Sequence, residues 1–225
     1  PGGQELEAPD TSLTQVTRHK FEFLSVQPRL LNTRCLVISW FYCKTENNQT
    51  SMSVQLDAST SSSRLAVSSD RLQVRESAVR SAAPSEEPLA EWPYVLGYAI
   101  ITAGRHYWEV EVSTNGGWRI GVMSESAPWK RRSHMSPGRG YWTLWKSSSC
   151  LWACTEEPTK LQRAAVPRLI GVYVDVGEGQ VSFYDVDRRV HIYTFSDTFR
   201  CGVVPVFGHL DADTVLKIIP AEMSV

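Results

Sequence analysis

The 225-residue sequence lacks an excess of charge of either sign. It holds 23 lysines and arginines against 24 aspartates and glutamates, which gives a formal net charge of −1. A chain with this balance has no overall field that attracts nucleic acid or an anionic membrane surface. We therefore expect no nucleic-acid partner, and any recognition driven by charge must come from a local cluster.

Long apolar runs are also missing. The longest run, residues 35–43, is about half of the roughly 20 residues that a helix needs to cross a bilayer. No basic-then-apolar signal peptide opens the sequence either. We expect no direct insertion into a membrane.

The common catalytic motifs are absent as well. The sequence has no Gly-x-Ser-x-Gly elbow, no Gly-x-x-x-x-Gly-Lys-Ser/Thr phosphate loop and no His-Glu-x-x-His motif, and its five histidines are scattered. Cys150 and Cys154 would supply half of a zinc site, but no second half accompanies them. We expect a non-catalytic chain without a metal or a cofactor.

Cysteine is scarce and its number is odd. Five cysteines in 225 residues do not form the even, closely spaced framework of a small disulfide-stabilised secreted domain. This pattern favours reduced thiols and a cytoplasmic location.

What the sequence does contain, from Val54 onward, is a series of short segments rich in Val, Ile, Tyr, Phe and Trp. Clusters of Gly, Ser, Asn, Asp and Pro separate them, which is typical of strands and turns. The predicted strands are Ser53–Leu56, Arg64–Val67, Leu72–Arg75, Tyr98–Ile101, His106–Val112, Trp118–Val122, Gly140–Leu144, Leu151–Cys154, Leu169–Asp175, Gln180–Asp185, Ile192–Phe195, Val203–Phe207 and Val215–Ile219. Because no long helical period competes, the pattern predicts an all-β fold of antiparallel sheets packed face to face.

Alternation along the strands assigns residues to the two faces of each sheet, since side chains two positions apart share a face. The apolar sets, which we expect in the core, are Trp108, Val110 and Val112, then Trp118, Ile120 and Val122, then Trp142 and Leu144. The same alternation turns Arg119 and Trp145 away from the core. Trp152 fits either face.

Several motifs in order resemble the PRY-SPRY (B30.2) domain. The segments that carry the resemblance are residues 54–57 and 64–68 for the PRY part, and 104–112, 140–144, 181–186 and 192–195 for the SPRY part. The resemblance implies a bent antiparallel two-sheet β-sandwich of the concanavalin-like jelly-roll type. It divides the chain into a leader or linker over 1–53, with room for one docking helix or strand, a PRY segment over 54–97 and a SPRY segment over 98–225. The last two together would form one B30.2 domain.

The resemblance also implies a partner-binding surface, a shallow pocket that the variable loops form at one end of the sandwich. Matching the family's motifs points first to Arg119 and Trp145, the residues that alternation turned outward. Guanidinium and indole groups are over-represented at binding hot spots. The further candidates are Trp92, Tyr94, Trp129, Lys130, Arg131, His134, Trp152, Lys160, His209 and Leu210. The structural alternatives are that Arg119 pairs with a carboxylate, that Trp145 covers a sheet edge and that the Lys130–Arg132 run is a solvated turn.

Three functions follow from the resemblance. The first is target recognition for a tripartite-motif E3 ubiquitin ligase in innate immunity, with a protein partner. Ubiquitin transfer itself would need a RING domain, whose zinc pattern is absent here. The second is a butyrophilin-type sensor that gathers a small phosphorylated ligand with Arg119, Lys130–Arg132, His134 and Lys160. The third is a B30.2 scaffold in an innate immune receptor. The domains upstream would distinguish the three.

Overall fold

The computed structural model describes residues 50–77, 93–113, 115–128, 134–162, 165–209 and 214–220. All of them belong to one compact unit, Asn32–Val225. The predicted docking element before residue 50 lies outside the described residues. Among the described residues, no helix is long and apolar enough to span a membrane, and no group of three acidic, His or Cys side chains is placed to hold a metal ion.

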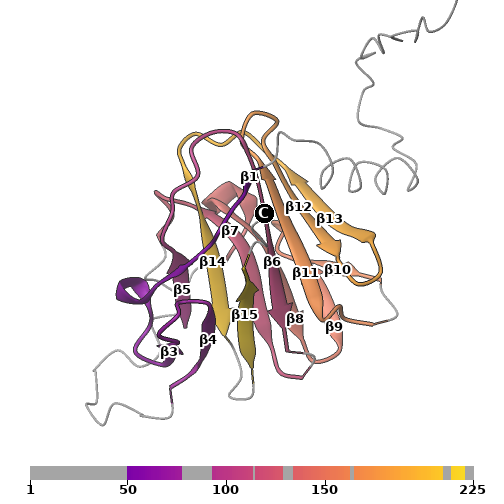
Figure 1. Ribbon diagram of the computed structural model, residues 1–225. Coiled ribbons are helices and arrows are strands. Elements are labelled where there is room, and N and C mark those ends of the chain that lie inside the picture. Colours follow the sequence, from indigo (N-terminus) through magenta and orange to yellow (C-terminus); the bar gives the residue numbers. More distant parts are fainter. Residues whose placement is uncertain are drawn as a thin grey trace, which may run out of the picture. The chain divides into compact units, whose positions relative to one another are not determined.

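The described residues form strands and two 3-10 helices, arranged as two sheets (Figure 1). The eight-stranded sheet has the order β13-β12-β11-β6-β15-β4-β3, with β1 paired to β6 beside this path. Its strands are β1 (Thr50–Ser51), β3 (Leu65–Val67), β4 (Gln73–Glu76), β6 (Arg105–Val112), β11 (Leu169–Asp175), β12 (Gln180–Asp185), β13 (Val190–Ser196) and β15 (Val215–Ile219).

The seven-stranded sheet has the order β10-β9-β8-β7-β14-β5-β2. Its strands are β2 (Leu56–Asp57), β5 (Tyr94–Gly97), β7 (Trp118–Ser124), β8 (Tyr141–Ser147), β9 (Cys150–Ala153), β10 (Thr159–Leu161) and β14 (Val203–His209). The 3-10 helices are η1 (Ala58–Thr60) and η2 (Pro137–Arg139). The predicted all-β two-sheet sandwich is confirmed. Its described strand pairs are antiparallel except β1 with β6, which is parallel.

The main core lies between the two sheets and contains the inward tryptophans. Trp108, Trp118 and Trp142 are buried, with exposed fractions of 3%, 0% and 4%. They pack in one cluster with the apolar residues that alternate with them on β6, β7 and β8. The assignment of these strand faces from the period of two is therefore confirmed.

A second apolar cluster covers the outer face of the seven-stranded sheet. Its members are Tyr94, Leu96, Met123, Ala127, Met135, Tyr141, Val204 and Val206. On β5, β7 and β8 these residues alternate with members of the main core, so they occupy the opposite side of the sheet. Part of this sheet is consequently buried on both faces.

Burial on both faces explains the one misplaced strand. The strand predicted at Tyr98–Ile101 lies instead at Tyr94–Gly97, where all four residues are buried. Continuous burial removes the apolar-polar alternation that marks a strand in sequence. Tyr98 and Ile100 are exposed by 70% and 54%, and in that segment Ile101 forms an isolated bridge to Val203.

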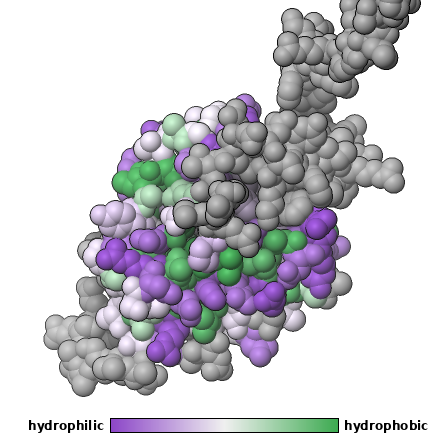
Figure 2. Space-filling view, in the orientation of Figure 1, coloured by the Kyte–Doolittle hydropathy of each residue, from purple (hydrophilic) through white to green (hydrophobic). Residues whose placement is uncertain are grey.

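Other strand boundaries were less clear from the sequence. The predicted strand Ser53–Leu56 overlaps β2 only at Leu56, and β1 and β10 were not predicted. Both missed strands are two or three residues long and largely polar, so no pattern can emerge from them. On the side of the molecule seen in Figure 2, apolar groups alternate with hydrophilic ones among the coloured residues, as expected for a solvated surface.

Candidate binding surface

Six residues form a single row across the outer face of the seven-stranded sheet. The strand register pairs each with the next: Tyr94 on β5, Gly208 on β14, Arg119 on β7, Trp145 on β8, Trp152 on β9 and Lys160 on β10. Directly paired residues of antiparallel strands lie side by side on one face. We call these six residues the cross-strand row. Five predicted site residues, all of its members except Gly208, are thus brought into one row.

The centre of the row is a stack of two indoles with a cation at each end. The Trp145 and Trp152 rings are stacked, with centroids 6.1 Å apart and planes 29° apart. The Arg119 guanidinium carbon lies 5.6 Å from the centroid of Trp145, and Lys160 Nζ lies 5.9 Å from that of Trp152. Both distances are within the range of cation–π attraction. The contacts fix the orientation of both rings.

Arg119 lies on the predicted face but is covered. It is only 7% exposed, because Tyr94 and Met135 lie against it. The Tyr94 hydroxyl donates to Met135 Sδ at 2.9 Å, and Arg119 Nη1 donates to the same sulfur. The guanidinium thus lies against a thioether, a phenol and an indole. The expectation of an exposed Arg119 among the loops is corrected: Arg119 lies within the row on the sheet face, and Tyr94 and Met135 cover it.

Gly208 makes room for this arrangement. A Cβ at Gly208 would lie 2.6 Å from Tyr94 Cε1 and 3.3 Å from Arg119 Cβ. A glycine inside a strand often marks such a close approach. Because no side chain intervenes at position 208, the ring of Tyr94 reaches across the strand toward Arg119.

The accessible part of the row is its β8–β10 half. Trp145 and Trp152 are half-buried and Lys160 is exposed. The Trp145 indole Nε1 is buried and has no hydrogen-bond acceptor among the described residues. A buried donor without an acceptor costs about 1–3 kcal/mol.

Burial also sets the protonation state of Tyr94. Desolvation raises the pKa of its phenol far above the usual value, although the Arg119 charge acts in the opposite direction. Tyr94 therefore remains a neutral hydrogen-bond donor to Met135 across the physiological range.

The remaining predicted site residues fall outside this row or outside the described residues. Trp92, Trp129, Lys130, Arg131 and Leu210 are not among the described residues. His209 ends β14, where its backbone pairs with Trp118, and its side chain is not described. His134 is exposed and precedes Met135. Tyr94 belongs to β5, and Trp152, which fitted either face, lies on the outer one.

Two members of the site had not been singled out from the sequence. Gly208 carried a usable signal, since an isolated glycine in a strand suggests close packing. Met135 carried none, because it lies outside the strands and no periodicity applies to it. Its role depends on the path of the chain before η2.

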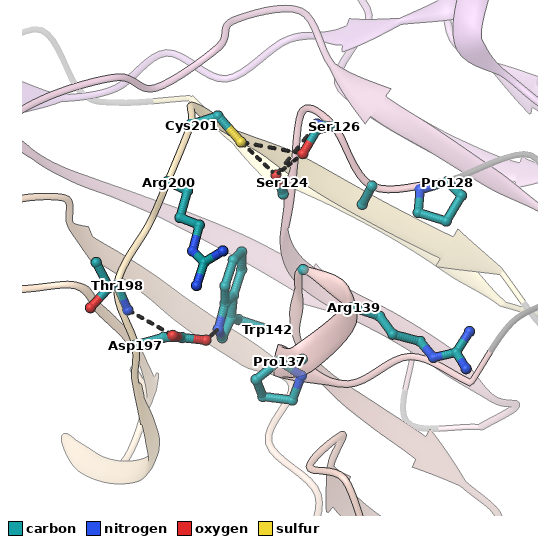
Figure 3. A pocket seen from close by; sticks show the side chains of 13 residues that line it. Ser124, Ser126, Pro128, Pro137, Arg139, Trp142, Asp197, Thr198, Arg200 and Cys201 are labelled. Atoms are coloured by element: carbon teal, nitrogen blue, oxygen red, sulfur yellow. Dashed lines mark hydrogen bonds between the residues drawn. The ribbon is translucent and has the colours of Figure 1, made fainter.

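A separate cavity of about 410 Å³ lies between the end of β7, η2 and the β13–β14 connection (Figure 3). Trp142 Nε1 donates to Asp197 Oδ2 at 3.1 Å on one side of it. On the other side, Cys201 Sγ lies 3.0 Å from Ser124 Oγ and 3.3 Å from Ser126 Oγ. These hydroxyl contacts lower the pKa of the Cys201 thiol. No sequence pattern predicts that these residues lie together.

A two-sheet sandwich with an aromatic and cationic row on one outer face defines a binding module. Residues 105–220 match the SPRY domain family, so the chain belongs to the SPRY (B30.2) family, and the resemblance predicted from its motifs is confirmed. SPRY domains are non-catalytic and serve as protein-interaction modules. The domain is shared by tripartite-motif ligases and butyrophilins.

Individual relatives are similar over the same region. Butyrophilin subfamily 1 member A1 of Homo sapiens is 38% identical over 156 residues, which cover 68% of this chain and 30% of that protein. The E3 ubiquitin-protein ligase TRIM21 of Mus musculus is 35% identical over 178 residues, which cover 76% and 38%. The crystal structure of the TRIM65 PSpry domain superposes with a TM-score of 0.66 at 21% identity, over 88% of this chain and 100% of that one. The chain spans 30% and 38% of the length of these two curated relatives.

Proposed function

We propose that this chain is the target-recognition domain of a cytoplasmic tripartite-motif-type E3 ubiquitin ligase of innate immunity. The chain itself binds the target protein, and another part of a longer protein transfers ubiquitin. The relationship to TRIM21, which is named as a ubiquitin ligase, supports this assignment. The surface that binds the target is the β8–β10 half of the cross-strand row.

The observation that carries the proposal is the pair of stacked indoles between two cations, one of whose N–H groups has no acceptor among the described residues. Large rigid rings contribute contact area at little cost in conformational entropy. A protein surface supplies both apolar area and backbone carbonyl groups.

The same geometry supports a protein partner over a phosphorylated small molecule, the butyrophilin-type alternative. Arg119 and Lys160 are three strands apart, or about 14 Å at a strand spacing of about 4.8 Å. Two indoles lie between them. The two cations therefore cannot converge on one phosphate group.

The proposal is tested by comparing three immobilised forms of the chain: the unaltered sequence, Trp152→Ala and Tyr98→Ala. Tyr98 is the matched control, because it is an exposed aromatic outside the row. A target protein should be retained by the unaltered chain and by the Tyr98→Ala variant. The affinity of the Trp152→Ala variant for the target should be at least about fivefold lower, as for a hot-spot residue. The purified target is then titrated against each form by calorimetry.

Two results would reject the proposal. If Trp152→Ala binds the purified target as tightly as the unaltered chain, the row is not the recognition surface. If inorganic pyrophosphate or an organic diphosphate gives a binding heat that Lys160→Met abolishes, the row serves a phosphorylated ligand instead.

A further inference from the structure

A cavity of about 440 Å³ opens between the edges of the two sheets. One wall comes from β10, the edge strand of the seven-stranded sheet, and the other from β13, the edge strand of the eight-stranded sheet. The described residues that line it are Lys160, Leu161, Gln162, Ala165, Arg188, Val190, His191 and Ile192. Its volume is in the range of roughly 300–1,000 Å³ found for ligand pockets.

The floor of this cavity is apolar. Leu161 and Ile192 are half-buried and pack against the main core from opposite walls, and Val190 lies beside them. At the sandwich edge the core is therefore partly open to an incoming side chain. An apolar group inserted here would extend the core rather than cover a polar surface.

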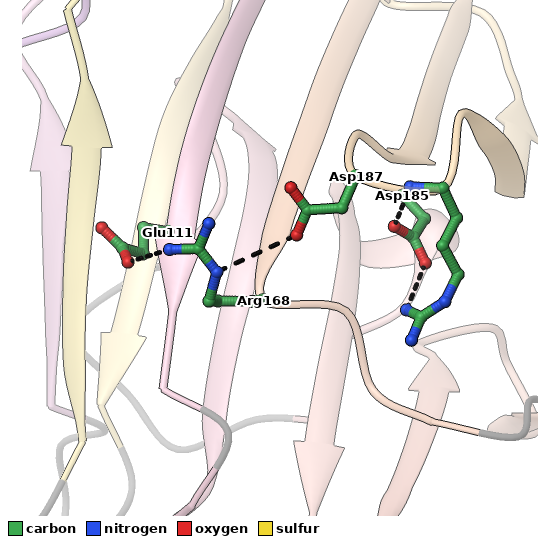
Figure 4. Close-up of polar contacts among 5 residues, drawn as sticks. Glu111, Arg168, Asp185 and Asp187 are labelled. Carbon is green, nitrogen blue, oxygen red and sulfur yellow. Dashed lines mark hydrogen bonds and ion pairs between the residues drawn. The ribbon is translucent and has the colours of Figure 1, made fainter.

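The rim of the cavity is basic. Lys160, Arg188 and His191 line it, and none of the described lining residues is acidic. Arg188 is held in place by the buried carboxylate of Asp185, whose Oδ2 lies 3.1 Å from Nη1, while its side chain remains 57% exposed (Figure 4). The nearby Asp187 instead contacts Arg168, at 3.9 Å. His191 is fixed by Thr194, whose Oγ1 lies 2.7 Å from Nε2.

We infer that this cavity binds an extended acidic peptide segment of a partner protein, with one apolar side chain of the peptide inserted into the floor. An apolar centre within a polar rim is the usual anatomy of a protein interface. The rim carries only positive or neutral groups among its described residues, so acidic residues on both sides of the anchor complement it. Both walls are edge strands, and an extended chain can pair with such an edge.

A peptide fits the site better than an isolated phosphate. The Arg188 guanidinium already has a carboxylate partner in Asp185, so it is not a free phosphate-binding group. Its exposed part can still contact an acidic side chain at the surface. A phosphate would also leave the apolar floor in contact with water. The bulge in β13, where the pairing with β12 shifts between Phe183 and Tyr184, limits backbone pairing to a short stretch. The inserted apolar side chain and the acidic residues of the peptide then supply most of the binding free energy.

This site is separate from the proposed function of the cross-strand row and does not depend on it. The two surfaces meet at Lys160, which contacts Trp152 on one side and lines the cavity on the other. A test must therefore alter a residue that belongs only to the cavity. Gln162 is suitable because it is exposed and lines the rim.

The experiment selects binders from a random ten-residue peptide display library with the full chain as bait. The enriched peptides should carry glutamate or aspartate on both sides of one apolar residue. In a titration with the best peptide, Gln162→Glu should weaken binding at least threefold, and Gln162→Lys should strengthen it. Replacing the apolar residue of the peptide by serine should weaken binding at least tenfold. Trp145→Ala, in the row but outside the cavity, should bind the peptide like the unaltered chain.

Each contrary outcome identifies a different error. No enrichment, or enriched peptides without an acidic bias, overturns the inference. Peptides that respond to Trp145→Ala but not to either Gln162 variant bind the row, which also overturns it and leaves the proposed function standing. If inorganic phosphate at millimolar concentration displaces the peptide and the serine-substituted peptide binds equally well, the cavity is an anion site and not a peptide site.

Discussion

Trp145 and Trp152 are directly paired across the β8–β9 hairpin and stack with their ring centroids 6.1 Å apart. Neither indole lies in the main core, since both are on the outer face of the sheet and half-buried. Their mutual contact and the cations at either end hold them in a defined orientation. A surface that keeps two large rings ordered before a partner arrives loses less entropy when it binds.

The first prediction concerns the energy of this stack. Trp145→Ala and Trp152→Ala should not be additive in the free energy of unfolding, because either change removes the same ring contact. The coupling should be about 0.5–1.5 kcal/mol, the value typical of aromatic pairs. Urea unfolding of both single variants and the double variant measures it.

A control cycle uses Trp152→Ala with Tyr98→Ala, since Tyr98 follows β5 at a distance from the hairpin and is 70% exposed. That pair should be additive within about 0.3–0.5 kcal/mol. Additivity of the two tryptophan variants would mean that the rings do not stack in solution.

The second prediction concerns Arg119, which the alternation along its strand turned away from the main core. Because it is 7% exposed and donates to Met135, Arg119→Ala should lower the free energy of unfolding by about 1–3 kcal/mol, through an internal void and the lost charge-assisted contact. Arg200→Ala, which removes an exposed arginine near η2, is the control and should change it by less than about 0.5 kcal/mol. Equal stability of the two variants would show that Arg119 is not buried.

The period of two was enough to place Arg119 and Trp145 on the outer face, but not to tell how far each is exposed. Exposure depends on what lies over the sheet, and there Tyr94 and Met135 come from segments distant in sequence. The cross-strand row could not be predicted from the sequence, because its residues become neighbours only through the register in which the strands pair. Lys160 reaches Trp152 only because β10 pairs with β9, and three largely polar residues give no strand signal.

The third prediction concerns Gly208. In Gly208→Ala the new methyl group would lie 2.6 Å from Tyr94 Cε1, so the ring must move away from Arg119 and Met135. We expect a loss of about 1–3 kcal/mol in the free energy of unfolding, as for overpacking of a buried site. Thermal or urea unfolding is the measurement.

Gly177→Ala is the matched control for this substitution. A Cβ at Gly177 would meet only Asp175 Oδ1, at an ordinary 3.5 Å. We expect a change below about 0.5 kcal/mol there, as at other surface positions. If Gly208→Ala is equally well tolerated, Tyr94 does not lie across β14 as described.

The sandwich was more predictable than the row because apolar and polar residues alternate along several of its strands, as on β6, where buried residues alternate with more exposed ones. On β7 the alternation is one of residue type, because Arg119 and Gly121 stand between apolar residues, although every residue of this strand is buried. Alternation failed at β5, whose Tyr94 and Leu96 pack on the second cluster while Val95 packs on the first. A strand buried on both sides cannot be distinguished by its period from any other short apolar run.

The fourth prediction concerns the reactivity of Cys201 toward iodoacetamide as a function of pH. Contacts with the Ser124 and Ser126 hydroxyls lower the pKa of the thiol, and the nearby Glu125 charge only partly opposes them. A lowered pKa means that more thiolate is present at a given pH below the usual midpoint, and the thiolate is the nucleophile. Alkylation of Cys201, followed by mass spectrometry of its peptide, should therefore reach half of its maximal rate at a lower pH than an ordinary cysteine does.

The matched comparison for Cys201 is the Ser124→Ala, Ser126→Ala double variant. Ser126 is exposed and Ser124 is a small side chain at the end of β7, so both substitutions should leave the fold intact, which circular dichroism can verify. With both hydroxyls gone, the thiolate loses its hydrogen-bond donors and the midpoint should move to higher pH. The same midpoint in both proteins would mean that the hydroxyls do not stabilise the thiolate. A shift to lower pH in the double variant would mean that the serines accept from the thiol and favour its neutral form.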